Sequence, residues 1–131
     1  MVKNWIIMIV LSIILAVSCY LESTFVKNSF SWLINSLEGL QIELTESKDD
    51  INKDEFIELA NSIHESWHKK VKVLKCLIWH TGIKDTEVGL ARISSYIKEN
   101  DYTEANAEIM SLIDYMAHYA DDFILSWENV F

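Results

Sequence analysis

One short segment of the chain matches a metal-binding motif of hydrolytic enzymes. It is an H-E-x-x-H motif, His64-Glu65-Ser66-Trp67-His68. On a helix this spacing places two imidazoles one turn apart to bind Zn²⁺, and the glutamate can activate a zinc-bound water. A catalytic zinc also needs a third protein ligand and an open coordination position. The motif leads to the hypothesis of a minimal zinc metalloprotease.

The residues beyond the motif do not complete a zinc site of a familiar type. In metzincin proteases a glycine and a third histidine follow at fixed distances, but Val71 and Leu74 occupy these two positions. A third ligand would have to come from Glu104 or Glu108, which lie four residues apart on one face of a later helix. Such proteases also bind the substrate backbone along a strand, and the sequence predicts no strand beside the motif.

Helical phase turns the motif away from the core. At about 100° per residue, His64 lies roughly 60° from the apolar stripe of its helix, His68 roughly 100° and Glu65 about 160°. The glutamate that would act as the base therefore faces solvent. We expect all three to be boundary or surface residues, with no bound metal, no cofactor and no enzymatic activity.

The two remaining histidines have simpler explanations than metal binding. His118 lies four residues from both Asp114 and Asp122, a spacing that favours ion pairing along one helix. His80 falls in the last turn of the second predicted helix, where a protonated imidazole interacts favourably with the helix C-terminus.

The elements that must position these residues are predicted to be helices only. Apolar residues recur every three or four positions, and no window alternates with a period of two. The chain has 131 residues, 50% of them hydrophobic, with no proline and three glycines, a composition that disfavours sandwiches and barrels. The sequence predicts an all-α fold, a small antiparallel helical bundle. Its helices cover about 22–46, 53–80, 84–99 and 102–127.

Several predicted helix ends carry capping residues. Asn52 with Glu55, and Asp101 with Glu104, resemble the capping boxes that begin the second and fourth helices. Gly82 is predicted to end the second helix, because glycine adopts the left-handed conformation at low cost.

The N-terminal region contains an apolar run long enough to cross a bilayer. Residues 5–21 carry no charge, and a helix of this length covers roughly 25 Å. Trp5 and Tyr20 flank the run at positions where aromatic rings sit in membrane interfaces. No proline or glycine pair separates the run from the next apolar stripe. We therefore expect one helix to leave the membrane and continue to about Glu46.

Flanking charges predict the orientation of this span. Lys3 and the terminal amine are positive on the leading side, whereas Glu22 and Lys27 cancel on the other side. The positive-inside rule then places the N-terminus in the cytoplasm and the domain outside it. The predicted topology in the cell membrane is a cytoplasmic segment at 1–4, a single-pass signal anchor at 5–21 and an extracytoplasmic bundle at 22–131.

Two other interpretations of the run remain open. Ala16-Val17-Ser18 offers a cleavage site for a secretory signal peptide, and the small residues before Cys19 loosely match a bacterial lipoprotein signal with lipidation at Cys19. All three interpretations place the domain outside the cytoplasm. Cys19 and Cys76 lie too far apart in the predicted fold to form a disulfide.

A set of helix and turn residues resembles one family. The set comprises Trp67, His80 with Ile83, Leu90-Ala91-Arg92-Ile93, Tyr96-Ile97, Asn100-Asp101, and Ala105 with Ile109. Together with the short apolar anchor, it resembles the bacterial domain-of-unknown-function family 4363, small membrane-anchored proteins of Gram-positive bacteria. The resemblance covers almost the whole chain and implies an anchored helical protein without an assigned activity. Cys19 is not part of the family's pattern.

Aromatic residues and charge indicate surfaces and partners. Trp32, Trp79 and Trp127 lie off or at the edge of their apolar stripes, which is typical of contact surfaces or of residues that cover the open end of a bundle. The net charge of −9 disfavours nucleic acid as a partner. Acidic residues dominate after Asp85, whereas four lysines cluster near the end of the second predicted helix.

The combined expectation is a membrane-anchored, extracytoplasmic helical protein that acts as a non-enzymatic interaction or structural module. Its expected partners are the lipid bilayer, through residues 5–21, and another membrane or envelope protein or a second copy of the chain. The alternative is a minimal membrane-bound zinc metalloprotease that uses His64, Glu65 and His68.

Overall fold

The fold is a bundle of helices with one long helical extension. The computed structural model describes residues 1–77 and 80–128, with side chains described outside 77–81 and 122–131. The described residues contain no strand, which confirms the all-α prediction. They form the helices α1 (Val2–Glu46), α2 (Asp54–Leu77), α3 (His80–Lys98) and α4 (Tyr102–Glu128).

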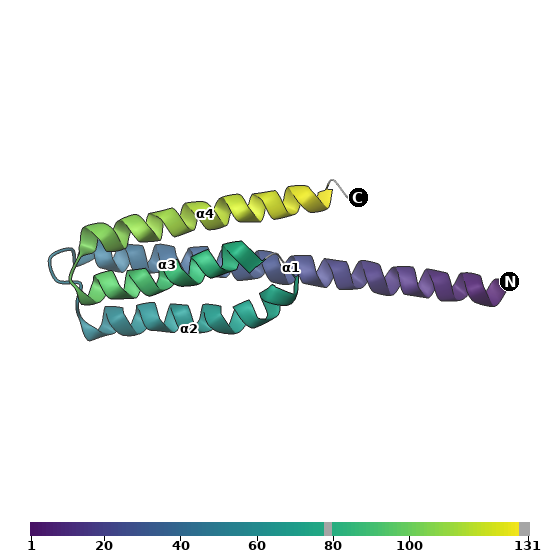
Figure 1. The fold of residues 1–131 in the computed structure, drawn as a ribbon, viewed down its shortest axis with the longest axis horizontal. Coiled ribbons are helices and arrows are strands. Elements are labelled where there is room, and N and C mark those ends of the chain that lie inside the picture. The colour runs from purple at the N-terminus through teal and green to yellow at the C-terminus, as the bar shows by residue number, and fades with distance from the viewer. Residues whose placement is uncertain (78–79, 129–131) are drawn as a thin grey trace.

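The helices are arranged as an antiparallel ring. Each one packs against two others: α1 contacts α2 and α4, and α3 contacts the same two helices. In Figure 1 the C-terminal half of α1 is one member of this ring, while its N-terminal half extends away from it alone. Successive helices run in opposite directions, as in other up-down-up-down bundles.

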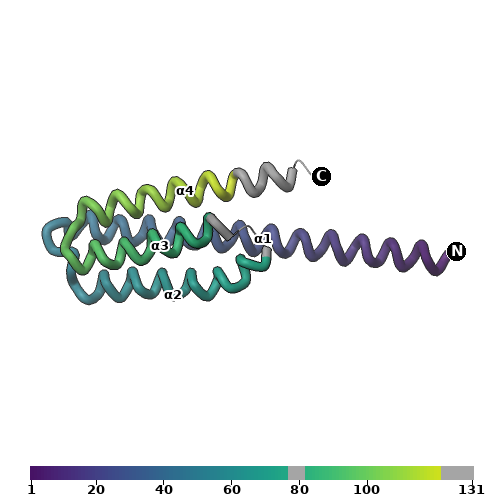
Figure 2. The backbone as a smooth tube through the Cα atoms, viewed as in Figure 1, coloured from purple at the N-terminus to yellow at the C-terminus, as the bar shows by residue number. Residues whose placement is uncertain are grey.

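The two ends of the bundle differ in what lies beside them. Figure 2 shows that the α1–α2 and α3–α4 connections meet at one end, here called the far end. At the opposite, near end, α1 leaves the bundle, α2 ends and α3 begins. Any group at the near end is therefore close to the extended part of α1.

The buried residues follow the stripes predicted from the sequence. Apolar side chains at three- and four-residue spacings point inward from every helix and form one core. In α1 these are Val26, Phe30, Leu33, Leu37, Leu40 and Leu44. Ile51 in the α1–α2 connection is also fully buried, and no periodic pattern marked it because it lies outside the helices.

The N-terminal half of α1 contributes nothing to this core. Its most apolar window has a mean hydropathy of 2.3, and none of that window is buried by the rest of the protein. The window is long and apolar enough for a helix to cross a membrane. The prediction of one continuous helix from this run to Glu46 is confirmed.

At the far end, Asn100 joins the two connections. It has φ of 58°, the left-handed conformation that asparagine tolerates better than most residues. The backbone amide of Asp101 donates to the carbonyl of Tyr96, which closes a Schellman motif after α3. The Asn100 side chain accepts a hydrogen bond from the Ile51 amide at 2.8 Å and donates to the Asp49 carbonyl at 3.3 Å. This network fixes the loop that buries Ile51.

The connection between α2 and α3 differs from the prediction. Gly82 does not end the second helix; it lies inside α3, which begins at His80 rather than at 84. His80 therefore begins a helix instead of closing one. A Cβ at Gly82 would lie 2.5 Å from Tyr115 Oη and 3.0 Å from Tyr119 Cε2. The glycine is needed for close packing of α3 on α4, not for a turn.

One of the two predicted capping boxes forms its expected backbone contact. The Glu104 amide donates to Asp101 Oδ1 at 3.1 Å, as predicted for the start of α4. The other helix, α2, begins at Asp54, and the Lys53 carbonyl accepts the amides of Phe56 and Ile57. The predicted capping residue Asn52 and the predicted start at 53 were therefore each one residue too early.

Candidate functional site

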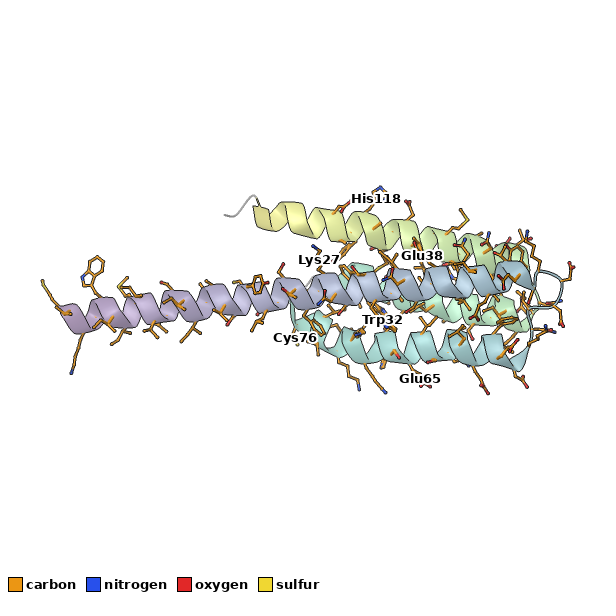
Figure 3. All side chains as sticks on the ribbon, turned by 180° about the vertical axis from the view of Figure 1, so that it is seen from behind. Lys27, Trp32, Glu38, Glu65, Cys76 and His118 are labelled. Atoms are coloured by element: carbon orange, nitrogen blue, oxygen red, sulfur yellow. The ribbon has the colours of Figure 1, made fainter. Side chains whose placement is uncertain are left out.

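The H-E-x-x-H motif lies near the middle of α2, at the edge of the core. Trp67 is completely buried, His64 is half-buried, and Glu65 and His68 are exposed. Figure 3 shows Glu65 on the outer side of α2, away from the other helices. Helical phase predicted this arrangement correctly, including the exposed glutamate.

A carboxylate from the neighbouring helix reaches the motif. Glu87 Oε1 of α3 lies 2.7 Å from His68 Nδ1, and the two side chains are 22% and 57% exposed. The sequence suggested Glu104 or Glu108 as the third ligand of a zinc site, but both belong to α4, and Glu108 lies 4.0 Å from Arg92. Glu87 directly follows the buried Thr86. This position at the edge of the apolar stripe of α3 is the one sequence feature that could have indicated a contact between Glu87 and a neighbouring helix.

An open hollow of about 510 Å³ lies over the His68–Glu87 pair. Its lining residues are His64, Glu65, His68, Lys69, Lys72 and Glu87. The two lysines raise the local potential and so oppose the binding of a divalent cation. Within the described part of the chain, no three His, Cys, Asp or Glu residues lie close enough together to hold a metal ion. The arrangement can link α2 to α3 through an imidazole–carboxylate contact.

Trp67 lies beneath the motif and serves the core. Its ring is 6.1 Å from that of Phe30 at an interplanar angle of 35°. Its indole Nε1 has no hydrogen-bond acceptor among the described atoms. Buried indole N–H groups usually donate a hydrogen bond where they have a polar role. Trp67 therefore contributes to the protein by packing.

Trp32 is the only predicted contact tryptophan whose side chain falls within the described residues; Trp79 and the side chain of Trp127 lie outside them. Trp32 is half-buried against α2, with Lys70 Nζ 5.1 Å from its ring centroid. It lines an open hollow of about 290 Å³ between α1 and α2. Part of the ring is thus already covered by a cation–π contact within the protein.

A group of aromatic rings joins α1 and α4 in the part of the bundle closest to the apolar run. Tyr119 meets Phe30 edge-on at 5.5 Å and stacks on Tyr115 at 6.1 Å. Desolvation by burial raises the pKa of the Tyr119 phenol. Burial, followed by the charge of Asp85 and by Tyr119, raises the pKa of Tyr115 as well. Both phenols stay neutral at physiological pH and act as packing groups.

The α1–α4 face carries a third open hollow, of about 600 Å³. Met110 is 56% exposed there, and Ile113 and Ala117 extend the apolar surface along α4. Glu38 and Asp114 add negative charge to its lining. In Figure 3 Glu38 lies on the α4 side of α1. This face combines exposed apolar area with acidic groups.

Comparison with known proteins assigns the family. A family model described as a domain of unknown function (DUF4363) matches residues 24–130. The chain belongs to the DUF4363 family. The resemblance inferred from the residues is thereby confirmed. No curated protein and no solved structure matches the chain.

The bounds of the DUF4363 match follow the structure. The match begins three residues after Leu21, the last residue of the apolar run, and extends through the described part of α4. The family domain is therefore the bundle, and the apolar run, including Cys19, lies before it. Cys19 and Cys76 are both free thiols in the structure, as expected.

Two predicted details of the DUF4363 bundle concern the histidine of α4. His118 Nδ1 lies 3.5 Å from Asp114 Oδ1 and 2.8 Å from the Asp114 carbonyl oxygen. The predicted pairing over four residues is thus present for Asp114. The side chain of Asp122, the other predicted partner, lies outside the described residues.

Proposed function

We propose that this DUF4363 protein is a membrane-anchored, non-enzymatic interaction module whose bundle lies outside the cytoplasm. The observation that supports it best is the continuity of α1 (Figure 1). One helix carries the uncharged run of residues 5–21 and then supplies buried core residues from Val26 to Leu44. The apolar run and the first helix of the bundle are therefore one continuous helix, with no linker between them.

Rigid continuity has a functional consequence. A flexible tether would let the bundle sample a large volume, whereas a continuous helix holds it at a fixed height above the bilayer. Fixed height favours partners that also reside in or near the membrane, because less orientational freedom is lost on binding. Another membrane or envelope protein is the partner class that fits this geometry.

The charges that flank residues 5–21 support the proposed orientation of the chain in the membrane. Lys3 and the terminal amine precede the run, while Glu22 and Lys27 offset each other after it. This asymmetry supports a cytoplasmic N-terminus and a retained anchor. An acyl chain found on Cys19 would instead select the lipoprotein form, with the same side for the bundle.

The surface that we assign to partner binding is the α1–α4 face. It exposes Met110, a flexible side chain that adapts to varied partners, next to the acidic Glu38 and Asp114. A partner with an apolar residue flanked by basic side chains matches this face. The non-enzymatic assignment is supported by Glu65, which points to solvent on α2 and away from the core.

Site-specific photocrosslinking in the native membrane tests this proposal. A photoreactive amino acid at Met110 samples the α1–α4 face, and one at the exposed Glu58 of α2 is the matched control. We expect a discrete crosslinked membrane or envelope protein from position 110 and none from position 58. Equal patterns from the two positions would contradict the assigned surface.

A further inference from the structure

The near end of the bundle is unusually rich in lysine. Between Glu65 and Asp85 the sequence has no acidic residue and five lysines. Lys72 and Lys75 are exposed on the last turns of α2, and Lys27 is exposed on α1. In Figure 3 the labelled Lys27 and Cys76 both lie at the end where α1 leaves the bundle, far from Glu38.

Helix geometry gives the height of these lysines above the apolar run. Lys27 lies six residues beyond Leu21, which is roughly 9 Å along α1. Lys70 Nζ lies 5.1 Å from the Trp32 ring, so this part of α2 is level with Trp32, roughly 16 Å beyond Leu21. Because α2 runs antiparallel to α1, Lys72 and Lys75 lie lower, at roughly 13 Å and 9 Å.

These heights fall within reach of lipid headgroups. The headgroup layer extends roughly 5–7 Å beyond the hydrocarbon on each side, and its charge acts over a Debye length of about 8 Å at physiological salt. All three lysines lie inside this combined distance, and their long side chains can extend toward the interface. Val73 and Cys76, exposed between and beside them, add apolar contact.

Most described acidic groups of the near end belong to α3 and α4, and of these Glu87 lines the same hollow as Lys72. Asp85 acts on Tyr115 of α4, Glu87 is paired with His68, and Asp121 is exposed on α4. Glu22 alone follows the apolar run on α1 before Lys27. On α1 just beyond the apolar run and on the last turns of α2, Lys27, Lys72 and Lys75 outnumber Glu22, so these two segments present net positive charge to the membrane.

We propose that the near end docks on anionic lipid headgroups of the same membrane through Lys27, Lys72 and Lys75. This proposal rests on the membrane anchor of the proposed function and adds a second lipid contact to it. Lysine ammonium groups bind phosphate oxygens as point charges, without a shaped pocket. Each lysine within this range shifts the ratio of docked to undocked bundle about fivefold, and three shift it on the order of 100-fold.

The native Cys76 is a built-in probe of this contact. The full chain with Cys19→Ala is labelled at Cys76 with an environment-sensitive fluorophore. It is then reconstituted in vesicles of phosphatidylcholine alone or with phosphatidylglycerol at roughly a third of the lipid. Both vesicle types contain a lipid with a nitroxide quencher on its headgroup. Because the lipids are the same in both leaflets, the measurement does not depend on the orientation of the chain.

We expect headgroup quenching of Cys76 to be stronger in the anionic vesicles and to fall toward the neutral level in high salt. The variant Lys27→Gln/Lys72→Gln/Lys75→Gln is expected to lose this difference. The matched control is Lys48→Gln/Lys53→Gln/Lys98→Gln, which removes three exposed lysines from the far end. It is expected to quench as the unmodified chain does.

Equal quenching in neutral and anionic vesicles, or equal effects of the two triple variants, would overturn the docking proposal. Quenching that depends on chain density rather than lipid charge would also overturn it, in favour of contact between two copies. Flotation of the same samples with the vesicles reports the anchor separately. A chain that floats but does not dock overturns this inference alone, whereas a chain that does not float overturns the anchor as well.

Discussion

The two halves of α1 differ both in apolar content and in how the apolar residues are arranged, and they need different surroundings. From Trp5 to Leu21 the large apolar residues are 47–71% exposed and occupy all sides of the helix. From Val26 to Leu44 the apolar residues of the stripe are 0–2% exposed, and most of the positions between them are polar. A helix that is apolar all round requires lipid, whereas one with a single stripe requires other helices. Apolar content and its arrangement around the helix together set where each half belongs.

The largest effects are expected from a charged residue introduced into either half of α1. Leu37→Asp puts an unpaired carboxylate in the core, and we expect it to unfold the bundle, at a cost of more than about 4 kcal/mol, while membrane retention persists. Ile13→Asp, at the centre of the run, is expected to impair insertion by about 2.5–3.5 kcal/mol and to leave the bundle folded. Flotation and far-UV circular dichroism of both variants check this; a variant that loses both properties would refute the division.

Trp67 of α2 is the largest side chain in the core that packs against the C-terminal half of α1. We expect Trp67→Ala to destabilise the bundle by about 3–5 kcal/mol, because it leaves a cavity beside Phe30. Trp67→Phe is the control and should cost less, because the indole Nε1 has no acceptor to lose. Denaturant unfolding of the detergent-solubilised chain measures both, and a cost below 1 kcal/mol for the alanine variant would mean that Trp67 is not a core residue.

Two glycines differ in their surroundings: Gly82 lies where two helices pack closely, and Gly39 lies on an open helix surface. Gly82→Ala would bring a Cβ against Tyr115 Oη, so we expect it to destabilise the bundle by about 1–3 kcal/mol. Gly39→Ala on α1 meets nothing within 4 Å and should stabilise the bundle by about 0.5–1 kcal/mol. Shifts of the same sign in thermal unfolding would show that α3 and α4 are not in close contact at Gly82.

The smallest change in stability is expected at the H-E-x-x-H motif, which lies on α2 and not on α1. His64→Ala and Glu65→Gln alter positions outside the core and should change stability by no more than about 0.5 kcal/mol. Purified chain should hold no stoichiometric zinc. One zinc per chain in elemental analysis, lost on changing His64 or His68, would support the metalloprotease instead.

Much of the fold was predictable because its elements obey simple periodicity. The stripes of α1, α2 and α4, the exposed Glu65 and the turn at Asn100 follow from spacing and local preference alone. Gly82 was misassigned because its reason is a tertiary contact with Tyr115, which no local pattern reveals. Burial of Ile51 depends on a hydrogen bond from a loop 49 residues away in sequence.

The candidate sites were harder to predict than the fold. Glu87 meets His68 only because α3 packs against α2 in one register, and the sequence offered Glu104 and Glu108 with equal plausibility. The lysines of α2 were visible as a cluster, but their height above the apolar run required the contact between Lys70 and Trp32. Sites on a bundle depend on which helices are neighbours, and spacing within one helix does not determine that.

Protease accessibility measures on which side of the membrane the bundle lies. The full chain carries one epitope tag before Met1 and a different one after Phe131, and intact protoplasts are treated with external protease. With the N-terminus in the cytoplasm and the bundle outside it, we expect loss of the C-terminal tag and retention of the N-terminal tag. Retention of the C-terminal tag in intact protoplasts, with its loss once they are lysed, would contradict an extracytoplasmic bundle.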